Sequence, residues 1–164
     1  MEWTKQIVRY IIVMLLQVLL FDQLQLFGVC HPYIYILCLL MMPITLPRSV
    51  EMIIGAVAGL LMDIFCNSLG VHMAACIFLM FVRPYLVGAL VNDKDRLNEQ
   101  ISSRTLGPEA MFRYVVILVI LYHFTVFMLA AWSWSHIGFV LLETLVSSII
   151  SIIVILSYNA LKYR

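Results

Sequence analysis

Six apolar runs, separated by shorter polar stretches, make up most of this 164-residue chain. A transmembrane helix needs about 20 predominantly apolar residues, with about 17 as the lower limit. Four of the runs pass that length, the third is close to the limit, and the second is short. The pattern predicts membrane spans at residues 9–27, 33–46, 50–66, 71–91, 114–132 and 137–161.

The second run, 33–46, contains Pro43, which removes a backbone hydrogen bond and kinks a helix. Membrane helices tolerate such breaks where neighbouring groups satisfy the freed carbonyl. The run is therefore either a short span or a re-entrant segment, and we expect a span. The only sizeable polar segment is then the loop 92–112, which is too short for a domain. We predict one all-α transmembrane domain, a six-helix polytopic bundle.

Basic residues predict the orientation of this bundle, because cytoplasmic loops of membrane proteins carry an excess of lysine and arginine. With six spans and both termini cytoplasmic, the inner loops and ends hold nine of the ten basic residues. The outer loops hold none. The tenth basic residue, Arg83, falls inside the fourth span.

Composition supports a membrane protein. The chain is 64% hydrophobic and 12% charged, whereas soluble proteins average about 45–50% apolar and about 25% charged residues. A chain of this size cannot hide so much apolar surface in its own core, so lipid must cover the rest. The net charge of +1 offers no basic patch for phosphates, and we expect no nucleic-acid partner. The four cysteines form no C-x-x-C pair, and we expect neither a metal nor a cofactor.

Small and polar residues recur every four positions in the third run, at Glu51, Gly55, Gly59, Asp63 and Asn67. This spacing forms a stripe that drifts slowly around one helix. A Gly-x-x-x-Gly pair lets a second helix approach closely, and the following acid should point into the same contact. The stripe either packs inside this bundle or docks a transmembrane helix of another protein. Our partner-contact candidates are Gly55, Gly59, Asp63 and Asn67.

A short turn joins the third and fourth spans. Counted at 1.5 Å per residue from that turn, Asp63 and His72 lie within about 3 Å in depth, so we expect a hydrogen bond between them. Gly70 and His72 would shape the hairpin. Arg83 lies roughly 13 Å deeper than Asp63, too far for direct pairing. We expect Arg83 and Pro84 to form a bend and inner anchor, with the guanidinium snorkelling or meeting an acid of another chain.

Three acids, Asp22, Asp63 and Glu143, fall at one depth in the predicted outer half. A charge inside a bilayer costs about 3 kcal/mol on insertion scales, so it marks function or a structural pairing. The acids are either solvated at the outer interface or form a proton- or cation-coupled site. The sequence contains no Gly-x-Ser-x-Gly elbow and no His-Glu-x-x-His motif. We therefore expect no enzymatic activity.

At the third and fourth spans the chain resembles the bacterial rod shape-determining MreD family. Members have about this length, are almost wholly transmembrane, and carry a glycine-rich third segment ending in Gly-Leu-x-x-Asp before a short turn with glycine. The resemblance covers about residues 43–86. The matching residues here are Gly55, Gly59, Leu60, Asp63 and Gly70.

This resemblance implies a non-enzymatic scaffold in the bacterial inner membrane. MreD-like proteins bind the single-pass protein MreC and help to connect the actin-like MreB filament with wall elongation. That machinery includes a RodA-type glycosyltransferase and a class B penicillin-binding protein. The resemblance also implies a bundle similar to the substrate-binding subunits of energy-coupling-factor transporters. This fold analogy keeps a second function open, a small-molecule carrier for a vitamin or a lipid intermediate.

Overall fold

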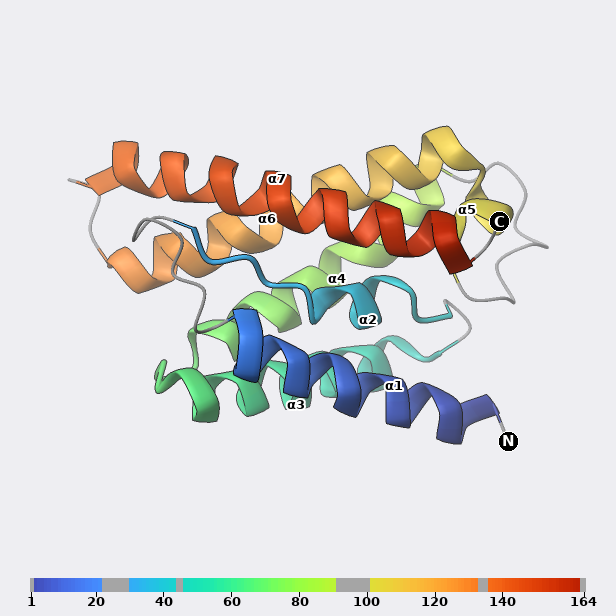
Figure 1. Ribbon diagram of the computed structural model, residues 1–164, viewed down its shortest axis with the longest axis horizontal. Helices are drawn as coiled ribbons and strands as arrows, with labels where there is room; N and C mark the ends of the chain where they lie inside the picture. Colours follow the sequence, from blue (N-terminus) through green and yellow to red (C-terminus); the bar gives the residue numbers. More distant parts are fainter. Residues whose placement is uncertain (1, 22–29, 44–45, 91–100, 133–135, 163–164) are drawn as a thin grey trace.

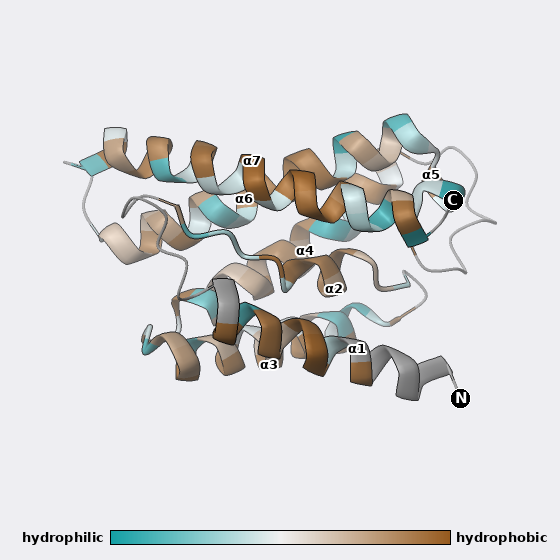
Figure 2. Cartoon of the chain, in the orientation of Figure 1, coloured by the Kyte–Doolittle hydropathy of each residue, from teal (hydrophilic) through white to brown (hydrophobic). Residues whose placement is uncertain are grey.

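The computed structural model describes residues 2–21, 30–43, 46–90, 101–132 and 136–162. Four long helices dominate these residues. By length and composition each is able to cross a membrane, and Figure 2 shows hydrophobic residues along most of their length. The protein is therefore an all-α, multi-pass membrane protein. The four helices are α3 (Arg48–Cys66), α4 (Val71–Leu90), α6 (Pro108–Ala131) and α7 (Ile137–Lys162).

The long helices form two antiparallel pairs. α3 packs on α4 and α6 on α7, while α4 also packs on α6 and so joins the pairs (Figure 1). α6 begins six residues earlier than expected because Pro108 occupies its first position and Gly107, at φ 86°, ends the preceding short helix α5 (Ser103–Leu106). The predicted loop 92–112 is therefore partly helical, and residues 92–100 lie outside the described part.

The first predicted span begins as helix α1 (Glu2–Leu16) and continues as a π-helical turn, η1 (Gln17–Phe21). Residues 22–29, which include Asp22, lie outside the described part. A π-turn widens the helix locally and often occurs where a side chain has a special task. Here the turn begins at Gln17, whose side chain is buried. α1 begins at the same end of the bundle at which α7 ends (Figure 1).

The run 33–46, expected to be a short span, does not form one continuous helix. The helix in this stretch, α2 (Ile36–Leu40), has five residues and rises only about 7.5 Å, far less than the 30 Å of a bilayer core. We call residues 30–43 the central segment. In Figure 1 it runs between α1 and α3 on one side and α6 and α7 on the other. Every side chain from Pro32 to Met42 is buried.

The central segment supplies much of the hydrophobic core. Ile36, Leu39 and Leu40 are fully enclosed and belong to the same hydrophobic core as buried residues of the long helices, such as Leu79 and Leu118. Irregular backbone is tolerated at membrane depth only where protein surrounds it, because lipid offers no hydrogen bonds. The five-residue helix and its flanks are possible here because the helices enclose them completely.

Candidate functional site: the central segment and the α3–α4 hairpin

Side chains of the surrounding helices bond the backbone of the central segment. Three N–H groups and four carbonyls within residues 31–42 have such partners. Gln17 of η1 makes two of these bonds. Its Nε2 donates to the Pro32 carbonyl at 3.0 Å, and its Oε1 accepts from the Ile34 N–H at 2.7 Å. One amide side chain thereby satisfies both a donor and an acceptor that a helix would have paired internally.

The α6–α7 pair also bonds the backbone of the central segment. Nδ1 of His123 lies 2.9 Å from the Val119 carbonyl oxygen and donates to it, which leaves Nε2 as an acceptor. That Nε2 accepts from the Tyr33 N–H at 3.4 Å. Ser147 Oγ of α7 accepts from the His31 N–H at 2.9 Å. Polar residues on three different helices thus hold one non-helical stretch.

Arg83 ties the far end of the central segment to α3 and α6. Its guanidinium is fully buried and pairs with Glu51, Nη1 to Oε1, at 2.6 Å. Nε donates to the Tyr114 hydroxyl at 3.0 Å, and Nη2 donates to the Met42 carbonyl. The Tyr114 hydroxyl in turn donates to the Leu40 carbonyl at 2.7 Å. A buried ion pair with additional hydrogen bonds is costly to break from one side only.

The predictions for Arg83 are therefore wrong: it neither snorkels nor awaits an acid of another chain. Depth counted from the hairpin turn would have identified its partner, because the depths of Glu51 and Arg83 along the two helices differ by only about 5 Å. Pro84 lies inside α4, as expected for a residue of the fourth span, and the bend expected at this proline stays a prediction. The sequence alone also did not identify Tyr114 and Gln17 as side chains that bond the backbone of the central segment.

The two stripe glycines lie in the contact between α3 and α4. A Cβ built on Gly59 would stand 2.5 Å from both the His72 carbonyl oxygen and the Met73 Cα. At Gly55 it would stand 2.7 Å from Met80 Cγ and 3.1 Å from a backbone oxygen of α4. The glycines permit close packing of the two backbones, which is the internal alternative left open above. α4 therefore covers this face, and we assign no partner helix to it.

Asp63 caps the beginning of α4. Its carboxylate accepts from the backbone N–H groups of His72 and Met73, both at 2.9 Å, and from the Ser68 hydroxyl at 2.7 Å. The first N–H groups of a helix lack intrahelical partners and carry partial positive charge, so a carboxylate satisfies both needs. The expected bond to His72 therefore reaches its backbone and not its ring.

The remaining hairpin residues divide between the turn and the core. Asn67 (φ 53°) and Gly70 (φ 88°) have left-handed backbones, which asparagine and glycine adopt at low cost. The ring of His72 points inward, where Nδ1 lies 2.9 Å from the Tyr122 hydroxyl of α6. That hydroxyl also bonds the Tyr35 hydroxyl of the central segment. His72 thus links α4 to α6, while Asn67 is exposed and ends α3.

A half-open cavity of about 360 Å³ lies beside the α3–α4 turn. We call it the turn cavity, and its polar and aromatic lining includes His31, Tyr33, Ser68, His72, Phe127 and Glu143. Asp63 is not part of the lining, since its carboxylate is engaged at the start of α4. Among the three acids expected at one depth, Glu143 lines this cavity and Asp22 lies outside the described residues.

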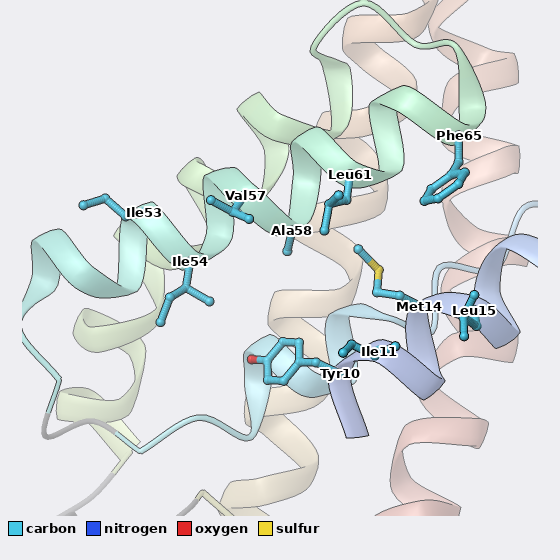
Figure 3. A pocket seen from close by; sticks show the side chains of 10 residues that line it. All are labelled: Tyr10, Ile11, Met14, Leu15, Ile53, Ile54, Val57, Ala58, Leu61 and Phe65. Atoms are coloured by element: carbon cyan, nitrogen blue, oxygen red, sulfur yellow. The ribbon is translucent and has the colours of Figure 1, made fainter. Parts of the chain in front are cut away.

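A second, wholly different hollow runs along the outside of α3. We call it the α1–α3 groove. Figure 3 shows side chains from the two helices facing each other across it. The groove measures about 430 Å³, and its lining residues are Tyr10, Ile11, Met14, Leu15, Ile53, Ile54, Val57, Ala58, Leu61 and Phe65. α1 packs against α2, and the Tyr10 hydroxyl donates to the Cys38 carbonyl at 2.8 Å.

Across the described ranges, no group of three or more His, Cys, Asp or Glu side chains is arranged to hold a metal ion. Comparisons of the chain with protein families, with curated proteins and with solved structures give no match.

Proposed function

We propose that this chain is a non-enzymatic membrane scaffold of the MreD type, which binds the transmembrane helix of an MreC-like single-pass protein. The sequence resemblance over residues 43–86 suggests the class of partner. The α1–α3 groove is the observation that carries the proposal, because it is an open, apolar surface running along a transmembrane helix. The other members of the elongation complex enter only through the resemblance: an MreB-like filament, a RodA-type glycosyltransferase and a class B penicillin-binding protein.

The interior of the bundle favours a rigid scaffold. The central segment fills the space between the helix pairs, and hydrogen bonds from α1, η1, α4, α6 and α7 hold its backbone. A bundle tied in this way resists rocking of one half against the other, which alternating access requires. Partner recognition is then expected on the outer surface of the molecule.

The form of the groove favours a helix as its occupant. Ile53, Val57, Leu61 and Phe65 follow one another at intervals of four residues on the wall formed by α3. They span about 18 Å along the helix axis. Rows of side chains four residues apart are the ridges against which a neighbouring helix packs. Figure 3 shows Tyr10, Met14 and Leu15 of α1 on the opposite wall.

A bulky side chain in the groove should block the partner. Val57 is 53% exposed on the groove wall, and Ile153 of α7 is 59% exposed and is not among the groove-lining residues. We expect Val57→Trp to reduce recovery of a co-expressed MreC-like protein at least tenfold in mild detergent, and to round the cells. Ile153→Trp is the matched control and should leave recovery unchanged. Equal recovery with Val57→Trp would mean that the groove holds only lipid and that the proposal fails.

A small-molecule carrier is the second candidate function. The turn cavity favours the carrier function, because binding a partner helix does not require a polar, half-open cavity at the end of the bundle. Tight binding of a vitamin or lipid intermediate by the purified protein, without any protein partner, would favour this candidate.

A further inference from the structure

We infer that the turn cavity binds the ammonium group of a small organic cation. The cavity has about 360 Å³, which is within the range of roughly 300–1,000 Å³ for ligand sites. It is built from the central segment, the α3–α4 turn, α6 and α7. The inference does not depend on the scaffold role, because it concerns a different surface and binding is measured on the chain alone.

The charge of the lining favours a cation. Among the described residues, Glu143 is the one carboxylate in the lining, and no described lysine or arginine contributes to it. The hydroxyl of Ser68, which also lines the cavity, is directed to Asp63. A half-buried carboxylate beside low-dielectric walls attracts a positive charge more strongly than a carboxylate in bulk water.

Aromatic rings supply the second feature of an ammonium site. Tyr33 lies edge-on to His72, with centroids 4.7 Å apart, and its ring is 6.3 Å from that of Phe127. The His31 ring is also 6.3 Å from Phe127. All four rings line the cavity. Clusters of aromatic faces attract ammonium groups that come within about 6 Å of a ring centroid, most strongly when water is excluded.

An ammonium group has two sources in a membrane. One is a free organic cation, and the other is the headgroup of a lipid such as phosphatidylethanolamine. The cavity adjoins the α3–α4 turn and the end of α6, where the long helices stop. Free cations and lipid headgroups can both reach this end of the helices. The two share a positively charged nitrogen, which is the group that the cavity would bind.

Choline is a suitable probe for the whole protein in nanodiscs of phosphatidylglycerol, which carries no ammonium group. At pH 8, equilibrium dialysis should show saturable binding at millimolar choline or below. We expect Glu143→Gln to weaken it at least tenfold, because the Coulombic attraction between the carboxylate and the quaternary nitrogen is lost, and Phe127→Leu roughly three- to fivefold through loss of a cation–π contact. Glu109→Gln is the control, because this exposed acid pairs with Arg113 and does not line the cavity.

A second set of nanodiscs containing half phosphatidylethanolamine separates the two sources. If the lipid headgroup is the natural occupant, the affinity for choline falls at least tenfold in the nanodiscs that contain phosphatidylethanolamine. If a free cation is the natural occupant, the affinity is the same in both sets of nanodiscs. Absence of saturable choline binding by the natural chain would overturn the inference. Equal binding by Glu143→Gln and the natural chain would do the same. Should Glu143→Gln fail to fold, unchanged binding by folded Phe127→Leu would also overturn it.

Discussion

Replacing Arg83 by methionine is expected to destabilise the bundle by about 3–5 kcal/mol, the cost of removing one partner of a buried ion pair. The change leaves the Glu51 carboxylate enclosed without a counter-charge and removes donors from the Met42 carbonyl and the Tyr114 hydroxyl. Reversible unfolding in mixed micelles, followed by circular dichroism, measures this loss.

Two companion variants show whether the ion pair is the cause. Arg83→Met combined with Glu51→Leu removes both charges and should recover at least half of the lost stability, because apolar replacements of whole buried pairs are often neutral. Arg113→Met is the surface control, since Arg113 and Glu109 are 60% and 79% exposed. It should cost at most about 1 kcal/mol. A loss below about 1 kcal/mol for Arg83→Met would contradict the assigned geometry.

Gly59→Ala is expected to cost about 2–3 kcal/mol, at the upper end for overpacking. The added methyl group would meet the His72 carbonyl oxygen and the Met73 Cα at 2.5 Å, and these backbone atoms of α4 cannot rotate away. The hairpin must therefore open for the variant to fold. Thermal unfolding in detergent gives the expected decrease directly.

Gly88→Ala is the matched control for this substitution. Gly88 lies in α4, and a Cβ added there meets no heavy atom within 4 Å. Alanine favours a helix over glycine by about 1 kcal/mol, so this variant should be as stable as the natural chain or slightly more so. If both alanine variants behaved alike, close packing at Gly59 would be refuted.

The long helices were predictable because length and apolar composition suffice to mark a membrane span. The predicted spans 50–66, 71–91, 114–132 and 137–161 correspond to α3, α4, α6 and α7, with shifts at their ends. The ends shifted where local signals decide, as at Pro108, which starts α6 before the apolar run begins.

The central segment was not predictable from its own residues. A run as apolar as 33–46 fits a buried helix and a buried irregular chain equally well, because both avoid water. The difference lies in distant residues that bond the irregular backbone, such as Gln17, His123 and Ser147. Each is an ordinary polar residue within an apolar run, and only the fold brings them together.

Gly55 and Gly59 were correctly predicted to lie in a close helix contact, and of the two neighbours left open, the internal one is found. The spacing of Gly55 and Gly59 predicts that another helix packs closely against them, but it does not identify that helix. A short turn favours the next helix in the chain, and α4 occupies the face. The ion pair of Arg83 was predictable by depth counting, provided that Glu51 had been included in the search.

The central claim is that buried polar side chains hold a non-helical segment inside the bundle. Solid-state NMR of the labelled protein in bilayers tests it through the Cα and Cβ shifts of Tyr33 and Ile34 and the contact from Gln17 Nε2 to the Pro32 carbonyl. The account predicts non-helical shifts, a contact between those two groups, and its loss in Gln17→Leu. Helical shifts running without a break from Tyr33 to Met42, with no contact to Gln17, would contradict it.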